Sequence, residues 1–294
     1  QGGRTPRGIR GSLMSDIHSI NEAINKKAGR KLVPSIVVGL SLLGLIWFSL
    51  SVYKELFLVV LVTAVVLGIR ELVRACNSRS IAISFPSLSI AAVALLCAAW
   101  SSGIAGLAIA TAISFPILLI RLLLNGPEGF VGKATATTFA LLYLPFLAGF
   151  LILLATPSTG FQRVMTFVVL VGCNDTFGYI VGVLLGKHPL VPTISPKKTW
   201  EGLVGSVVFT IIGGCLAFHY IMDMDWWIGV IVGLMIVFTA TCGDLIESAM
   251  KRDMSLKDMG TLLPGHGGML DRLDSVVLSA PAMWLALELV KRYL

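Results

Sequence analysis

Long uninterrupted apolar runs, separated by short polar segments, dominate the pattern along this chain. Apolar and polar residues do not alternate over the roughly ten-residue segments that a β-barrel requires. Nine runs reach or approach the roughly 20 residues of a membrane-crossing helix. They are Leu32–Tyr53, Leu56–Ile69, Ile81–Trp100, Gly103–Ile120, Ala134–Ala155, Val164–Leu185, Leu203–Met222, Trp226–Cys242 and Ser275–Val290. The pattern predicts an all-α, polytopic integral membrane protein with about nine transmembrane helices, of which the second, eighth and ninth are short.

The polar segment before the first run is distinct from the rest of the chain. Residues 1–31 contain no long apolar run, and the Gly- and Arg-rich residues 1–13 predict disorder. No Pro-, Gly- or Ser-rich linker divides the remainder. We therefore expect a partly disordered cytoplasmic segment over 1–31 and a single transmembrane domain over 32–294.

The basic residues predict how the chain is oriented. Only 13% of the residues are charged, about half the share of a soluble domain, and the net charge is +7. With a cytoplasmic N-terminus, 19 of the 23 Lys and Arg residues fall on the cytoplasmic side and four fall outside. This split follows the positive-inside rule. The basic balance is thereby explained without a nucleic-acid partner.

Two predicted cytoplasmic segments carry organised polar residues. The first, "GKHPLVPTISPKKTWEG" (186–202), contains Lys197 and Lys198. The second, from residue 243 to 274, contains Asp244 as well as Asp271 and Asp274, which share one face of a helix at the start of the ninth run. Carboxylates from two helix ends could converge on a hard cation such as Mg²⁺.

Basic residues and glycines in the second segment suit phosphate binding. The side chains of Lys251, Arg252, Lys257 and Arg272 could neutralise phosphates beside the acidic residues. Glycines flank His266 and permit close approach of backbone N–H groups to an anion. Taken singly, each feature has an ordinary reading: an Asp-x-x-Asp pair is more often a solvated helix turn, and a lysine pair a topology marker. Their combination in this order is far more specific.

Asp175 poses a separate question, because it lies near the middle of the sixth run beside Asn174. A carboxylate at that depth costs about 2.5–3.5 kcal/mol on insertion scales, so it should face protein or a wet cavity. One interpretation is a pocket for a lipid headgroup, and the other is a buried structural pair with a Lys or an amide.

The segment from Ser248 to Asp274 resembles the signature of the phosphatidate cytidylyltransferase (CDP-diacylglycerol synthase) family. The upstream stretches "ND" (174–175), "SPKKTWEG" (195–202) and "GDLIES" (243–248) are similar to the family as well, and the specific resemblance covers about residues 170–280. The matching residues of the signature are Ser248, Met250, Lys251, Arg252, Lys257, Asp258, Gly260, Leu263, Pro264, His266, Gly267, Gly268, Asp271, Arg272, Leu273 and Asp274.

The resemblance implies an enzyme that converts CTP and phosphatidic acid into CDP-diacylglycerol and pyrophosphate. It implies Mg²⁺ as cofactor, with one or two cations, a homodimer, and an active site facing the cytoplasm from the cell (inner) membrane. Metal ligands would be Asp244, Asp271 and Asp274. Catalytic residues would be Asp244, Asp271, Lys198, Arg272 and His266, with His266 as a phosphate or positioning contact, not a base. Substrate-binding residues would be Asn174, Asp175, Ser195, Lys197, Lys198, Lys251, Arg252, Lys257, Gly267 and Gly268.

Three other functions are open to a chain of this kind. A CTP-dependent lipid kinase would use the same nucleotide and transfer its γ-phosphate. A CDP-alcohol phosphotransferase would need acidic residues spaced Asp-x-x-x-Asp, whereas the spacing between Asp271 and Asp274 is shorter. A transporter would show paired broken spans in two halves, and the concentration of charge toward the C-terminal end argues against it.

Overall fold

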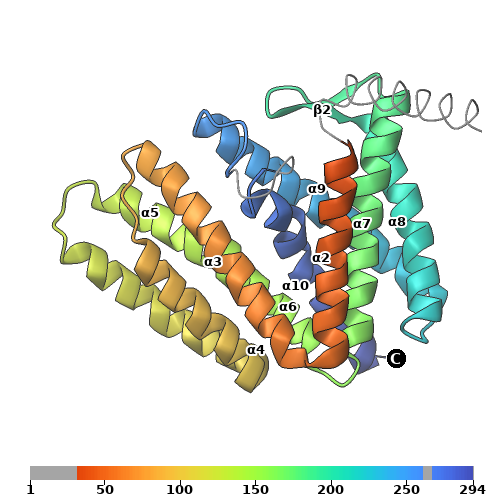
Figure 1. The fold of residues 1–294 in the computed structure, drawn as a ribbon, viewed down its shortest axis with the longest axis horizontal. Coiled ribbons are helices and arrows are strands. Elements are labelled where there is room, and N and C mark those ends of the chain that lie inside the picture. Colours follow the sequence, from red (N-terminus) through yellow and green to blue (C-terminus); the bar gives the residue numbers. More distant parts are fainter. Residues whose placement is uncertain (1–31, 261–266, 294) are drawn as a thin grey trace, which may run out of the picture.

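The computed structural model describes residues 32–260 and 267–293, and it is almost entirely helical (Figure 1). The predicted segment 1–31 and His266 lie outside these residues. A π-helical turn, η1 (Leu142–Phe146), joins α5 and α6. The helices are α2 (Leu32–Val52), α3 (Lys54–Ser78), α4 (Phe85–Leu123), α5 (Phe130–Leu141), α6 (Leu147–Ala155), α7 (Gly160–Leu185), α8 (Trp200–Tyr220), α9 (Trp226–Asp253) and α10 (Leu270–Tyr293).

Seven helical segments within 32–260 and 267–293 are long and apolar enough to cross a membrane. They are Lys54–Ser78, Phe85–Leu123, Phe130–Ala155, Gly160–Leu185, Trp200–Tyr220, Trp226–Asp253 and Leu270–Arg292. Gly39–Val52 adds a shorter apolar helix. The prediction of an all-α membrane protein is confirmed, and the count of nine stays a prediction.

Helix α4 is a hairpin of two limbs that reverses at Gly103. This glycine has φ 62° and ψ −147°, a conformation that residues with a Cβ avoid. The limbs then pack backbone against backbone, because a Cβ on Gly106 would lie 2.1 Å from the carbonyl oxygen of Ala98. Figure 1 shows the limbs side by side. The break falls between the third and fourth predicted runs.

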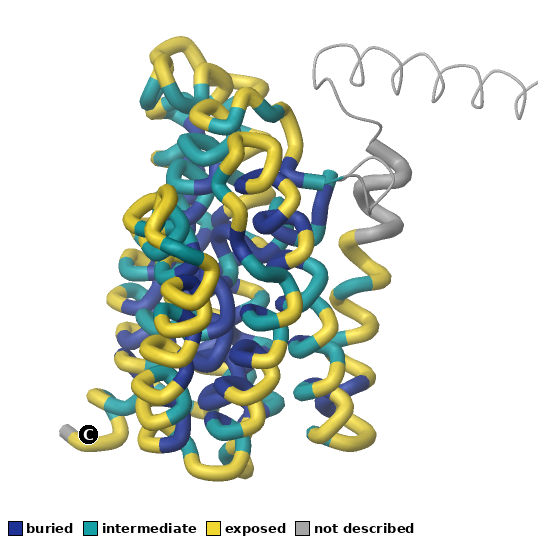
Figure 2. Tube along the Cα trace, turned by 90° about the vertical axis from the view of Figure 1, so that its left-hand side faces the viewer, coloured by how far each residue is buried: buried dark blue, intermediate teal, exposed yellow. Residues whose placement is uncertain are grey.

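Small residues hold the C-terminal helices close together. A Cβ on Gly202 of α8 would come within 2.8 Å of the carbonyl oxygen of Gly178 on α7, and Ser206 lies against the same glycine. Such contacts suit membrane helices, which associate by close packing because lipid offers no hydrophobic driving force between them. Figure 2 shows buried positions gathered along the middle of the bundle and exposed ones on its outer faces.

Contacts between distant segments define the two ends of the bundle. At one end, Lys54 Nζ donates to the carbonyl oxygen of Pro157 at 2.7 Å. At the opposite end, the Arg79 guanidinium donates to the carbonyl oxygen of Asp253 at 2.9 Å and also contacts Ser255. The second end carries the segments that the charge pattern predicts to be cytoplasmic.

The segment between α7 and α8 forms a small antiparallel hairpin, β1 (Pro189–Val191) with β2 (Ser195–Thr199). An all-α prediction omits it, because hydropathy indicates only a polar loop here. Both strands are edges, so the proline in β2 is tolerated. The hairpin fixes the position of Lys198 ahead of α8, and the Thr199 hydroxyl caps that helix by accepting from the N–H of Gly202 at 3.1 Å.

Candidate active site

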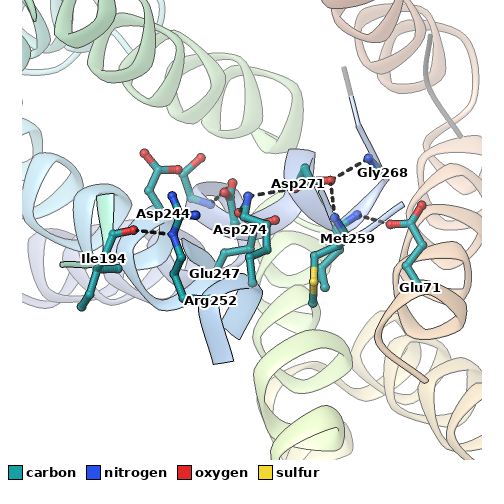
Figure 3. Close-up of polar contacts among 12 residues, drawn as sticks. Glu71, Ile194, Asp244, Glu247, Arg252, Met259, Gly268, Asp271 and Asp274 are labelled. Atoms are coloured by element: carbon teal, nitrogen blue, oxygen red, sulfur yellow. Dashed lines mark hydrogen bonds and ion pairs between the residues drawn. The ribbon is translucent and has the colours of Figure 1, made fainter. Parts of the chain in front are cut away.

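The polar residues of the site lie on turns that extend two helices beyond their apolar runs. α9 continues past Cys242 to Asp253, and α10 begins at Leu270, before the predicted start at Ser275. These additional turns carry acidic and basic side chains that gather at one end of the bundle, between the β-hairpin and α3 (Figure 3).

Lys198 and Asp244 form the first ion pair of the site. Lys198 Nζ lies 2.5 Å from Asp244 Oδ2, and the two side chains are 27% and 28% exposed. A second contact ties the hairpin to α9, since Arg252 Nε donates to the carbonyl oxygen of Ile194 at 3.2 Å. The structure thus joins the two polar segments that the sequence singles out.

Lys251 forms the second centre of charge. Its ammonium group lies 3.0 Å from Asp271 Oδ1 on α10 and also pairs with Glu247, one turn earlier on α9. Glu247 is only 2% exposed, and its Oε1 has no hydrogen-bond partner among the residues that the structure describes. The sequence pattern gave Glu247 no role in the site.

Backbone N–H groups hold the carboxylate of Asp271. Asp271 Oδ2 accepts from the N–H of Gly268 at 2.6 Å and from that of Met259 at 3.2 Å. Gly267 has φ +79°, and a Cβ there would lie 2.7 Å from the same oxygen. In this structure the N–H of Gly268 thus contacts the protein's own carboxylate, and the contact of these glycines with a substrate phosphate stays a prediction.

Glu71 supports this segment from α3, and sequence reasoning missed it. Its carboxylate is 5% exposed and accepts from the N–H groups of Met269 at 3.0 Å and Leu270 at 2.9 Å. These are donors at the start of α10, which a helix leaves without internal partners. Figure 3 shows Glu71 approaching from α3 on the far side of Asp271. The one available signal was an acidic residue between Arg70 and Arg74, just beyond the second apolar run.

Asp175 faces α10 from the middle of α7. Its carboxylate accepts from Asn174 Nδ2 at 2.8 Å and from the hydroxyl of Ser275 at 3.3 Å. Asp274 is 7% exposed and accepts from the N–H of Ser275 at 2.6 Å. Ser206 fixes the backbone of Asn174 through a 2.7 Å hydrogen bond, while Asn174 Oδ1 is buried and has no partner in the described part of the chain. Asp175 and Asp274 thus meet at Ser275.

The remaining predicted residues are more peripheral. Lys197 and Lys257 are exposed, Ser195 is half-buried at the start of β2, and Arg272 is half-buried in the first turn of α10.

The donor set fits a hard cation by its chemistry. Within residues 32–260 and 267–293, no three His, Cys, Asp or Glu side chains converge as a ready cage. Mg²⁺ seldom needs one, because it usually takes one or two carboxylates together with waters and substrate phosphates. Glu247 Oε1 and Asn174 Oδ1, which are buried and have no partner among the described residues, are acceptors of the kind that such an ion or its waters would satisfy.

Comparison with known proteins agrees with the chemistry of this site. A sequence model of the cytidylyltransferase family matches residues 34–290. Phosphatidate cytidylyltransferase of Mycobacterium bovis is 36% identical over 278 residues, covering 90% of each chain. That of Mycobacterium leprae is 36% identical over 280 residues with the same coverage, and that of Staphylococcus aureus is 37% identical over 58% of this chain and 65% of its own. The chain belongs to the cytidylyltransferase family.

Proposed function

We propose that this protein transfers the cytidylyl group of CTP to phosphatidic acid, releasing pyrophosphate and forming CDP-diacylglycerol. The observation that carries the proposal is the pairing of Lys198 with Asp244 and of Lys251 with Asp271 at one end of a membrane bundle. Basic and acidic groups side by side suit a nucleotide triphosphate, whose phosphates need cations and whose metal needs carboxylates. The names of the relatives support the choice of substrates.

The reaction needs charge neutralisation more than a base. A phosphate monoester has a second pKa near about 6, so the lipid phosphate is largely dianionic at neutral pH. One of its oxygens attacks the α-phosphorus of CTP, the bond from that phosphorus to the bridging oxygen of the β-phosphate breaks, and its electron pair leaves on pyrophosphate. Bringing one anion onto another is the barrier, so positioning and cationic side chains supply the catalysis.

The lysines are the residues best placed for that task. Lys198 and Lys251 are partly exposed, at 27% and 18%, and each lies against a carboxylate that orients it. In our proposal they bind phosphates of CTP or of the lipid together with Arg272. Ser195, Lys197, Arg252, Lys257, Gly267 and Gly268 complete the substrate contacts, with His266 as a positioning contact.

Asn174 and Asp175 would serve the membrane side of the site. Both lie on α7, below the hairpin, and Asp175 reaches Ser275 on α10. We propose that they line the place where the lipid headgroup meets the nucleotide. The alternative is that Asn174 and Asp175 have a purely structural role. Their hydrogen bonds within the protein are compatible with either role.

We propose Mg²⁺, as one or two ions, for the acidic residues. Asp244, Asp271 and Asp274 would hold it, with Glu247 as a fourth carboxylate close to Lys251. When bound, the cation would neutralise phosphate charge and orient the reacting groups. Asp244 and Asp271 would then exchange part of their contact with lysine for contact with the ion.

The same proposal includes topology and assembly. Nine spans with a cytoplasmic N-terminus would place the site on the cytoplasmic side of the inner membrane, where CTP is present. This orientation rests on the 19-to-4 division of basic residues. A homodimer is the assembly that the family resemblance suggests, and no nucleic acid is involved.

The proposed function is tested by determining which phosphorus of CTP is transferred to the lipid. Purified protein in mixed micelles receives phosphatidic acid, Mg²⁺ and CTP labelled at either the α- or the γ-phosphate. Label should enter the lipid only from the α-position, with release of pyrophosphate. Lipid labelled from the γ-position would mean a lipid kinase, and unlabelled lipid with folded protein would favour a transporter.

A further inference from the structure

An apolar groove opens on the outer face of the bundle. It has a volume of about 740 Å³, within the range of small-molecule sites, and lies between the second limb of α4 and the α5–η1 segment. Its lining is apolar and aromatic apart from two threonines and a tyrosine hydroxyl. Phe115, Phe139 and Leu142 line it and are each about 40% exposed (39%, 38% and 41%), so the groove is open on the outer face of the bundle.

The π-helical turn shapes the inner wall of this groove. Pro145 lies within η1 and lacks the N–H that an α-helical turn would use. Single π-helical turns inside helices are frequent at functional sites. The turn contributes Leu142, Tyr143 and Phe146 to the lining, and the ring of Tyr143 stacks on that of Phe139 with centroids 5.0 Å apart.

Tyr143 connects the groove to the charged site. It is only 5% exposed, yet within residues 32–260 and 267–293 its hydroxyl has no hydrogen-bond partner, although a buried tyrosine hydroxyl usually has one. The neighbouring Leu144 lies beside Leu273, since both approach within 4 Å of the position of a Cβ on Gly68. The wall of the groove thus lies close to Leu273, which stands between Arg272 and Asp274 in the first turns of α10.

We propose that this groove binds one acyl chain of the phosphatidic acid substrate and that the Tyr143 hydroxyl donates a hydrogen bond to an oxygen of its glycerol ester or phosphate. The proposal rests on the proposed function, since it needs a lipid phosphate at the neighbouring charged site. The interior of a bilayer is as apolar as the groove, so an acyl chain that moves from the bilayer into the groove gains nothing from the hydrophobic effect. The groove thus selects among chains by shape, while the hydroxyl contributes to lipid binding.

A tryptophan placed in the groove tests whether the groove selects among acyl chains. Thr135 lines the groove from the exposed side of α5, and Val131, one turn earlier and 77% exposed, does not line it. Thr135→Trp should lower the ratio of kcat/KM for dioleoyl over dihexanoyl phosphatidic acid about tenfold, in line with the cost of overpacking. Val131→Trp should leave the ratio as in wild type. Equal ratios in the two variants would overturn the proposal and mean that the groove holds only bulk lipid or a second copy of the chain.

Tyr143→Phe tests the hydroxyl without changing the ring. We expect KM for phosphatidic acid to rise about three- to tenfold, the value of one hydrogen bond, with kcat and the KM for CTP within twofold of wild type. An unchanged KM for the lipid, or an equal rise in the KM for CTP, would remove Tyr143 from lipid binding.

A crosslinking measurement is independent of turnover. Phosphatidic acid with a diazirine midway along one acyl chain, irradiated with wild-type protein, should label the second limb of α4 or α5, and unlabelled dioleoyl phosphatidic acid should compete. Labelling elsewhere would overturn the groove as the acyl site. Failure of the proposed function is a different result, because wild-type protein would then form no labelled lipid from α-labelled CTP.

Discussion

Glu71 on α3 caps the first turn of α10 by accepting a 2.9 Å hydrogen bond from the N–H of Leu270, 199 residues later in the chain. The same carboxylate accepts from Met269, and Asp271 follows immediately. Space for it exists because Gly260 and Gly268 lack a Cβ, which would lie 2.3 Å from its oxygens. The N-terminal half of the bundle thereby holds the segment that carries the candidate catalytic carboxylate.

Removal of this carboxylate should loosen the site. Glu71→Ala leaves two buried N–H donors without partners, which costs about 2–4 kcal/mol in total. We expect the midpoint of thermal unfolding in detergent to fall by about 5–10 °C, and kcat to fall because Asp271 loses its support. Glu55→Ala, an exposed glutamate on the same helix, is the matched control. Glu71→Asp should recover part of both losses, and identical behaviour of the two alanine variants would contradict the capping role.

Lys198 should be essential for handling phosphate. Lys198→Ala removes the cation that lies 2.5 Å from Asp244. We expect kcat/KM for CTP or for phosphatidic acid to fall about 10²- to 10³-fold, the usual loss when one donor to a developing anion is removed. Lys187→Ala, an exposed lysine just before the same hairpin, should retain wild-type kinetics. Unchanged kinetics in Lys198→Ala would make this lysine a topology marker.

Asp271 should be required for turnover but not for insertion. Asp271→Asn keeps an oxygen that can accept from Gly268, while it removes the charge that pairs with Lys251. We expect turnover to fall at least about 10³-fold, with the protein still folded in the membrane. Asp253→Asn, exposed at the end of α9, serves as control. Activity near wild type in Asp271→Asn would end the assignment of this residue to the metal.

Hydropathy predicted the helices but shortened those that build the site. The second, eighth and ninth predicted runs were short because charged segments limit them. These three runs correspond to α3, α9 and α10. Each of these helices extends beyond its apolar run. The additional turns carry acidic residues such as Glu71, Glu247 and Asp274, which are buried against other helices. A hydropathy scale assigns each carboxylate the full free-energy cost of entering the membrane. It cannot include the polar partners that tertiary structure provides.

The sequence pattern identified the polar segments of the candidate site but not the contacts between them. The ion pair of Lys198 with Asp244 joins two polar segments that were both identified, although the contact was not. Glu71 and Tyr143 could not be found, because one lies in α3 and the other in η1, far from the charged segments in sequence. Their relation to the site depends on how α3 and η1 pack against α10.

Removal of divalent cations tests the proposed role of the carboxylates. Excess EDTA should abolish turnover and added Mg²⁺ should restore it, because the phosphates of CTP need the cation beside the acidic residues. Asp244→Asn should raise the Mg²⁺ concentration required for half-maximal rate, whereas Asp253→Asn should not. Full activity in EDTA would rule out the metal, and an unchanged Mg²⁺ requirement in Asp244→Asn would remove that residue from the ligand set.

Accessibility to a membrane-impermeant thiol reagent tests the proposed orientation. In a variant whose five native cysteines are replaced by alanine, one new cysteine is introduced at Lys187, beside the hairpin, or at Asp223, in the turn between α8 and α9. The two positions lie at opposite ends of α8, which is long and apolar enough to cross a membrane. With the predicted orientation, intact cells whose outer membrane has been removed should label only the cysteine at 223, and lysed cells should label both. The reverse pattern in intact cells would place Lys198 and Asp244 outside the cytoplasm, away from CTP, and would contradict both the positive-inside assignment and the proposed function.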